Sequence, residues 1–416
     1  MSELAVPAHG NAEPQLVTSF AEVREAWKCP HLSADIGGAG AEFFHTGTVI
    51  RVDGDLHRTR RRAMGRLIKQ QGHKQFRDTA LIPTARALLD EVLGSPDADG
   101  YARTDLIQWG RRTNFRLGAA MVGFDAGRSG SSADELIGLM DTLLKGRPGN
   151  AAIALGLSDL DNPEFRAAVG ARNEIIERFY RPALARRRAL LDEVHAGRLQ
   201  DSELPVDLIM LIALQADPAW KDEEVAAREA LFLFNAGVHT TTVSLQWAVR
   251  ELFEWLGSHP ADRSRLSEDA FLLRVLEESM RLHPVTNGFP RVAVEDVRLG
   301  GGTVIQKGQL AILKSGPADV DAAEFGPDAL EFNPDRRMPP GTPDYAFAFG
   351  AGAHQCFGLP IVMGAQGLDG SLMHMFRLLL AAGLEIDPDG PALDPLAAAR
   401  GVHHPEPHRF VVRFPV

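Results

Sequence analysis

Cys356 is the residue of this chain best suited to do chemistry. It lies in the stretch FGAGAHQCFG at residues 349–358, and Cys29 is the only other cysteine among 416 residues. A thiolate needs positive potential, which the first turn of a helix supplies through its free N–H groups. Pro360 suits the first turn of a helix that we expect over residues 359–381. The sequence therefore predicts a thiolate held at the start of a helix.

Three glycines surround this cysteine: Gly350, Gly352 and Gly358. Glycine lets backbone amides approach the sulfur and permits turns that other residues avoid. A nucleotide-binding loop is disfavoured because no βαβ pattern surrounds the stretch, and zinc is disfavoured because no second cysteine or nearby ligand pair accompanies it. A single thiolate fits a metal that needs one protein ligand, and haem iron with an axial cysteine is such a metal.

The residues at 349–358 match F-G-x-G-x-H-x-C-x-G, and on them the chain resembles the cytochrome P450 family of haem-thiolate monooxygenases. Three further motifs stand in the family's order: H-x-x-x-R from His57, AGVHTT at 236–241, and Glu278-x-x-Arg281, which in the family locks to an arginine that is here Arg336. The resemblance covers about residues 15–416. It implies a mainly α fold with a minor β lobe, in which a long central helix lies over haem b.

The resemblance also assigns haem-binding residues one by one. It implies Cys356 as the axial iron ligand, Phe349 packed against the haem near the sulfur, and Gly350 and Gly358 as close backbone neighbours. Arginine and histidine side chains suit haem propionates, which would otherwise be buried unpaired. The residues implied to hold the propionates are His57, Arg61, Arg291 and His354.

The oxygen-binding motif departs from the family pattern at one position. The usual A/G-G-x-D/E-T carries an acid that relays protons, and this chain has His239 there. Thr240, the threonine that guards against unproductive loss of peroxide, is kept, and we expect catalytic roles for both residues. Three roles stay open for His239. It carries a proton itself, with an ordinary pKa of about 6.5, it anchors a polar or anionic substrate group, or it is a structural histidine bonded to a carbonyl of a neighbouring helix.

Helices must position most of these residues. Apolar side chains recur with helical spacing over residues 79–94, 133–145, 162–197, 205–215 and 268–282. The longest predicted helix runs from Asp222 to Leu256. Gly237 and the three threonines weaken its middle, which predicts either a local bulge or groove, or a buried helix whose threonine hydroxyls bond back to backbone carbonyls.

Short β-like pieces predict a minor sheet. They are separated by Gly and Pro turns. The predicted strands are Gln15–Thr18, Gly47–Val52, Val297–Leu299, Val304–Ile305, Gln309–Leu313 and Arg409–Phe414.

Composition limits the classes of function. The formal net charge of −11 argues against nucleic-acid binding as the main function. The first fifteen residues carry no Lys or Arg, and no run of eighteen apolar residues exists, so we expect a cytoplasmic protein without membrane insertion. We expect a single cytochrome P450 domain over residues 1–416, with a shortened N-terminus and no fused reductase domain.

The resemblance implies a monooxygenase that inserts one oxygen atom from O2 into a small hydrophobic substrate. Separate ferredoxin and ferredoxin reductase partners would deliver the electrons, and the basic stretch at residues 57–74 is either their dock or a solvated helix face. Two alternatives stay open: a peroxide-driven or non-redox enzyme that uses His239 as acid or base, and a haem-binding interaction module without oxygen chemistry. The predicted substrate contacts are Asn235, Ala236, Val238, Val285 and Phe289.

Overall fold

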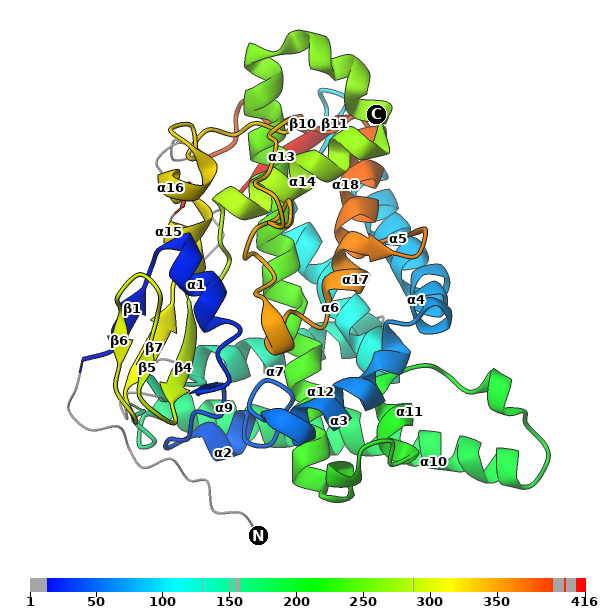
Figure 1. Cartoon of the computed structure of the whole chain (residues 1–416). Helices are drawn as coiled ribbons and strands as arrows, with labels where there is room; N and C mark the ends of the chain where they lie inside the picture. The colour runs from blue at the N-terminus through cyan, green and yellow to red at the C-terminus, as the bar shows by residue number, and fades with distance from the viewer. Residues whose placement is uncertain are drawn as a thin grey trace.

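The structure is a computed structural model, and it describes residues 13–128, 130–149, 152–153, 158–286, 288–391, 400–401 and 409–416. Helices make up most of it, and a four-stranded sheet lies at one side, at the left of Figure 1. The predicted fold class, mainly α with a minor β lobe, is confirmed. Among the described residues, no helix is both long enough and apolar enough to cross a membrane.

Helix α13 (Val238–Ser258) runs through the middle of the molecule (Figure 1). It packs against α6 (Leu106–Val122), α14 (Asp269–Leu282) and α18 (Ser371–Ala381). Every residue from 241 to 252 is buried. A helix buried on all sides belongs to the core of a large domain, so α13 is the axis on which the other helices pack.

The helix predicted from Asp222 to Leu256 is interrupted at Gly237. Helix α12 (Glu223–Ala236) ends there, α13 begins directly after it, and the Gly237 N–H donates to the carbonyl of Asn235 instead of continuing the i to i−4 pattern. The Thr240 hydroxyl donates to the Ala236 carbonyl at 3.0 Å, as expected of a hydroxyl that competes for backbone groups. The expected irregularity in the middle of the helix is confirmed.

The four-stranded sheet has the order β1-β7-β4-β2. Strand β1 (Gln15–Val17) is parallel to β7 (Leu310–Leu313), whereas β4 (Phe289–Ala293) is antiparallel both to β7 and to β2 (Leu32–Ser33). Helix α1 (Phe20–Ala26) contributes Phe20, Val23 and Ala26 to the hydrophobic core beside this sheet. The sheet carries Arg291 on β4.

One predicted strand is wrong. Residues Gly47–Val52 form turns: the Thr48 N–H and hydroxyl both point to the His45 carbonyl, and the Arg51 N–H donates to the Thr48 carbonyl. The Val49 N–H donates to the Glu229 carboxylate. Because these backbone N–H groups already have partners, they are not available for pairing with a neighbouring strand, despite the alternating pattern of this segment.

The single helix predicted over residues 359–381 is also wrong. Helix α17 covers only Leu359–Met363, a hairpin of β8 (Gly364–Ala365) and β9 (Leu368–Asp369) follows, and α18 begins after it. Gln366 and Gly367 have φ of 55° and 77°, as a tight two-residue hairpin turn requires. A Cβ on Gly370 would overlap the Val362 carbonyl, so glycine is needed where the hairpin closes.

Residues 79–94, 133–145, 162–197 and 205–215 are mostly helical, as predicted, whereas the periodicity did not predict α6. Two π-helical segments, η2 (Arg77–Leu81) and η4 (Ile176–Tyr180), join consecutive helices, and η4 lies inside residues 162–197, which were predicted as one helical stretch. The other helices are α2 (Ala41–Phe44), α3 (Gly54–Met64), α4 (Gln70–Phe76), α5 (Ile82–Leu93), α7 (Gly130–Gly146), α9 (Pro163–Ile175), α10 (Arg181–His195), α11 (Leu208–Ala213), α15 (Ser315–Asp319) and α16 (Ala322–Phe325). The short 3-10 segments are η1 (Gly65–Leu67), η3 (Asp125–Gly127), η5 (Asp201–Glu203), η6 (Pro218–Lys221), η7 (Pro260–Ser267) and η8 (Gly352–His354). The other strands are β3 (Tyr101–Asp105), β5 (Val297–Arg298), β6 (Val304–Ile305), β10 (Glu385–Ile386) and β11 (Val411–Pro415).

Candidate functional site

The loop that carries Cys356 is closed by its own backbone. The Cys356 N–H donates to the Phe349 carbonyl at 2.8 Å, and Pro360 stands in the first turn of α17, as predicted. The backbone N–H groups of Gly358 and Leu359 donate to the Cys356 sulfur. These donors favour a thiolate, because they point at the atom where its charge resides.

The Cys356 sulfur lies in a recess of the protein. The residue is exposed, yet the protein packed around its sulfur is dense enough that burial raises the pKa of the thiol, against the Gly358 N–H and the Arg61 charge, which lower it. A sulfur that is both surrounded and accessible can still receive a ligand. A bound metal cation would favour the thiolate over the thiol.

Two glycines of the loop are required by Trp27, a residue that the motif did not indicate. Gly350 has φ of 63°, and a Cβ there would lie 2.9 Å from the Trp27 ring. Gly352 has φ of 67°, and a Cβ there would lie 2.5 Å from the Trp27 carbonyl oxygen. At Gly358 a Cβ would be 3.7 Å from the sulfur, an ordinary contact, so the demand for glycine is strongest at the first two positions.

Helix α3 is docked onto this loop through His57 and Arg61. The His57 ring lies against the His354 ring with centroids 4.1 Å apart. Arg61 donates to the Gln355 carbonyl at 2.9 Å, and its guanidinium lies 5.3 Å from the centre of the Phe357 ring. Burial, with the His354 and Arg61 charges, lowers the pKa of His57 to about 4, so His57 is neutral at pH 7.

His354 is oriented by Asp53, the residue just before α3. Its Nε2 lies 2.7 Å from the Asp53 carboxylate, which also accepts from the Ser33 hydroxyl at 2.6 Å. Burial opposes ionisation of Asp53, but these hydrogen bonds outweigh it and hold the pKa of the carboxyl well below its usual range. Asp53 is therefore a fixed negative charge that holds one nitrogen of His354.

Arg291 and Arg51 are two buried cations at this site. Arg291 is 8% exposed, donates to the Pro290 carbonyl, and lies 4.8 Å from the centre of the Trp27 ring; no carboxylate of the described residues pairs with it. Burial lowers the pKa of each guanidinium to about 10, and the charge of Arg291 lowers that of Arg51 further. Arg51 was not predicted, because an isolated arginine in a turn carries no sequence signal.

These residues fit the cofactor that the motif implies. Arg291 is a buried guanidinium to which no described carboxylate is paired, and a haem propionate would supply the anionic partner. Within the described ranges, no three His, Cys, Asp or Glu side chains come together as a metal site, so a metal bound through Cys356 would rely on one protein ligand.

The Glu278-x-x-Arg281 motif makes the predicted lock with Arg336. Arg281 is fully buried and binds both oxygens of Glu278 at 2.8 Å, and Arg336 binds the same carboxylate at 2.9 Å. Arg281 also donates to the carbonyls of Asp319 and Ala329, and Arg336 donates to that of Glu331. The lock thereby fixes the segment that leads to the cysteine loop.

His239 and Thr240 occupy the first turn of α13, next to the interruption. His239 is exposed and Thr240 is half-buried. One turn before, in α12, the side-chain oxygen of Asn235 is buried without a hydrogen-bond partner among the described residues. The interruption therefore places the exposed His239 imidazole and the Asn235 side-chain oxygen, which has no partner among the described residues, close together along the chain.

The other predicted substrate contacts differ in their surroundings. Val238 is 3% exposed and packs into the largest hydrophobic core, whereas Ala236 is half-buried. Val285 packs beside Val243 and Trp247. The centre of the Phe289 ring lies 4.8 Å from that of Trp27, the same tryptophan that lies against Gly350 and Gly352 of the cysteine loop.

Known proteins share parts of this sequence and the whole fold. A family model described as Cytochrome P450 matches residues 259–364. The mycinamicin IV hydroxylase/epoxidase of Micromonospora griseorubida is 36% identical over 135 residues, which cover 32% of this chain and 31% of that protein. The bifunctional cytochrome P450/NADPH–P450 reductase 2 of Bacillus subtilis (strain 168) is 28% identical over 48% of this chain and 21% of that protein. The chain thus covers less than a third of these curated relatives.

Solved structures match over nearly the full length. Substrate-free CYP109E1 from Bacillus megaterium has a TM-score of 0.70 at 18% identity and covers 96% of this chain, which in turn covers 93% of that chain. P450BioI in complex with an acyl carrier protein has a TM-score of 0.64 at 19% identity, with 96% and 92% covered. The fold, the matched motif region and the curated relatives agree: this chain belongs to the cytochrome P450 family.

Proposed function

We propose that this protein is a haem-thiolate monooxygenase that inserts one oxygen atom from O2 into a small hydrophobic substrate. The observation that carries the proposal is Cys356, an exposed residue whose sulfur receives two backbone N–H groups. When bound, haem b, the cofactor of the family, supplies the binding and reductive activation of O2, with thiolate donation that favours O–O cleavage.

The chain's own residues divide the remaining work. Arg291 and the His57–His354 pair would hold the propionates, with Arg51 as a further buried cation nearby. Thr240 and His239 would hold and move protons at the first turn of α13. The Thr240 hydroxyl is now tied to the Ala236 carbonyl, so it can turn to another acceptor only by releasing this bond.

We infer that the substrate is moderately hydrophobic and carries one hydrogen-bonding group. The Asn235 side-chain oxygen supports this view, because it is buried without a hydrogen-bond partner among the described residues, which is costly unless a ligand donates to it. Ala236, Val285 and Phe289 would supply apolar contacts.

Arg62 and Arg66 are proposed to dock an acidic electron donor of the ferredoxin type. Both are exposed, and neither makes a hydrogen bond or ion pair with a described residue. Their neighbour Arg61 contacts Gln355, next to Cys356, so a partner on this face would lie close to the sulfur. The Bacillus subtilis relative, by contrast, is a bifunctional protein that joins a cytochrome P450 and an NADPH–P450 reductase.

The carbon monoxide spectrum of the reduced protein tests the central proposal. We expect the red-shifted Soret band of thiolate ligation, its loss in Cys356→Ala, and its retention in Cys29→Ala, the matched control. A Soret band at the position of imidazole ligation in the unmodified protein would overturn the proposal.

Charge reversal tests the docking face separately. Arg62→Glu and Arg66→Glu should slow the first electron transfer from a ferredoxin about tenfold at low salt, while haem content stays the same. Arg263→Glu, an exposed arginine of η7, is the matched control. Equal rates in all three variants would remove the docking face.

Peroxide-driven turnover is the second candidate function. The observation that favours it is His239, which is exposed where the family has an acid. Product formation with hydrogen peroxide alone, lost in His239→Ala, would establish it; failure of peroxide where a reductase succeeds would reject it.

A further inference from the structure

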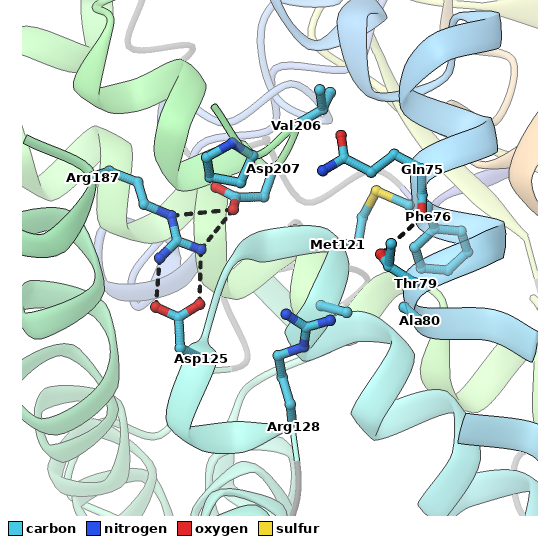
Figure 2. A pocket seen from close by; sticks show the side chains of 12 residues that line it. Gln75, Phe76, Thr79, Ala80, Met121, Asp125, Arg128, Arg187, Val206 and Asp207 are labelled. Carbon is cyan, nitrogen blue, oxygen red and sulfur yellow. Dashed lines mark hydrogen bonds and ion pairs between the residues drawn. The ribbon is translucent and has the colours of Figure 1, made fainter. Parts of the chain in front are cut away.

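A cavity far along the chain from the cysteine loop lies between α4, α6, α10 and the segment before α11. Its volume is about 200 Å³. It is lined by Gln75, Phe76, Thr79, Ala80, Ala120, Met121, Asp125, Arg128, Arg187, Pro205, Val206 and Asp207 (Figure 2). None of these residues belongs to the site described above.

One wall of the cavity is a buried ion cluster centred on Arg187. Arg187 is 5% exposed and bridges two carboxylates: its Nη2 lies 2.8 Å from Asp125 and 2.6 Å from Asp207. Asp125 also accepts from the Nε of Arg186 at 2.9 Å, and Asp207 accepts from the Met210 N–H at 2.8 Å. The cluster is satisfied within the protein, so neither carboxylate needs a ligand.

Arg128 is the cation of this cavity that the cluster does not use. Figure 2 shows its side chain rising into the space between the Arg187 cluster and Met121. Arg128 is exposed, and its side chain makes no hydrogen bond or ion pair with any residue that the structure describes; its backbone N–H donates to the Asp125 carbonyl. Of the lining residues, Arg128 and Arg187 are positive and Asp125 and Asp207 are negative; Arg186, which does not line the cavity, adds a positive charge beside Asp125 and leaves Arg128 as the unmatched cation.

The opposite wall is largely apolar and offers one free amide. Phe76, Ala80 and Met121 line it, and Figure 2 shows the Gln75 amide directed toward the same space. The Gln75 side chain has no hydrogen-bond partner among the described residues. An anionic group at Arg128 and Gln75 would thus have an apolar surface beside it.

We propose that this cavity binds a small monocarboxylate with a short apolar body. One negative charge matches the one cation that the cluster does not use, and a guanidinium on one side with an amide on the other offers donors to the oxygens of a carboxylate. The volume equals that of about seven liquid water molecules and lies below the ~300 Å³ at which drug-sized pockets begin, so the ligand is small. A dianion would leave one charge uncompensated against an apolar wall.

Calorimetric titration of the haem-loaded protein with benzoate tests this inference. We expect saturable binding that weakens at least about tenfold in Arg128→Gln, the loss of one charged hydrogen bond. Arg166→Gln, an exposed arginine of α9, is the matched control and should bind as the unmodified protein does. Acetate, which lacks the apolar body, benzyl alcohol, which lacks the charge, and inorganic phosphate should each bind at least about tenfold more weakly.

Two results would overturn the proposal. The first is benzoate binding that is equal in Arg128→Gln and in the unmodified protein, or phosphate binding as tight as that of benzoate. The second is unchanged binding in Ala120→Leu, which should narrow the cavity without touching any charge. Neither result depends on turnover, so failure here leaves the proposed oxygenase activity untouched, and failure of the oxygenase proposal leaves this site untouched.

Discussion

The lock around Glu278 and the interruption of the central helix at Gly237 differ in whether their polar side-chain atoms have hydrogen-bond partners. Glu278 is 4% exposed, and Arg281, Arg336 and the Asn333 N–H all bind its carboxylate. Beside Gly237, by contrast, the Asn235 amide oxygen is buried without a partner among the described residues, and His239 is exposed. The difference shows that the polar groups of the lock are satisfied within the chain, whereas the Asn235 oxygen has no partner among the described residues.

The largest expected effect is on the lock. Glu278→Ala would leave the fully buried Arg281 without its carboxylate, which should cost about 3–5 kcal/mol of folding free energy. Urea unfolding measures it. Asp335→Ala, which removes a surface partner of Arg265 and Arg274, is the control and should cost less than about 1 kcal/mol. Equal losses of folding free energy in the two variants would mean that the Glu278 lock stabilises the protein no more than a surface ion pair does.

The hairpin after α17 should be nearly as sensitive. Gly370→Ala would place a Cβ into the Val362 carbonyl, and relief of that overlap should cost about 1–3 kcal/mol. Gly257→Ala, in α13 with no atom within 4 Å of the added Cβ, is the control and should stabilise the protein by about 0.5–1 kcal/mol. An unchanged free energy of unfolding in Gly370→Ala would show that the hairpin backbone can shift to accept a Cβ without loss of stability.

At the interruption we expect effects on chemistry more than on stability. Thr240→Val removes a hydroxyl proposed to manage protons, so the fraction of reducing equivalents lost as hydrogen peroxide should rise by roughly tenfold. Thr242→Val is the matched control. Its hydroxyl donates to Val238 and accepts from Asn114, so the change should cost about 1 kcal/mol of stability without more peroxide. Equal peroxide yields in both variants would contradict the role of Thr240.

The smallest expected effect belongs to Glu277, the neighbour of the locked Glu278. Burial and the Asp344 charge raise the pKa of Glu277 to about 7 from 4.5. Between these two values the folded protein keeps a proton that the unfolded chain has released, so stability falls as the pH rises from about 4.5 to 7.

Glu277→Gln should remove that fall. Because the side chain is partly solvated, we expect a gain of no more than about 1 kcal/mol at pH 8 and little change at pH 4.5. Urea midpoints at several pH values measure it. Parallel curves for the variant and the unmodified protein would show that Glu277 does not titrate in this window.

The sequence predicted many of the helices, because helical periodicity reports burial directly, but it did not predict α6 or the strands β3 and β4. Residues 268–282 were predicted as a helix and form α14 at Asp269–Leu282, and the strand Val304–Ile305 is β6. The failures share a cause. At 359–381 and Gly47–Val52, local pattern and propensity pointed to a regular element, but glycine turns and a long-range bond to Glu229 decided the backbone.

The candidate site was predictable only where a motif fixes it. His57 lies against His354, and Arg61 binds the Gln355 carbonyl, so the residues that the family motifs indicate lie close together. Trp27, Arg51 and Asp53 were missed, because each acts through a neighbour that is distant in sequence and has no characteristic spacing. The roles of His239 and of the substrate contacts stay predictions, since they depend on groups that only a ligand would complete.

The interruption at Gly237 also has a consequence for backbone dynamics. A continuous helix through the core would resist opening along its whole length, because its hydrogen bonds form one cooperative unit. Here α12 and α13 are two separate hydrogen-bonded units, and both are packed in the core, α12 through residues such as Leu231 and Phe234. Asn235 therefore lies at a helix end, where local opening breaks fewer backbone hydrogen bonds than it would inside one continuous helix.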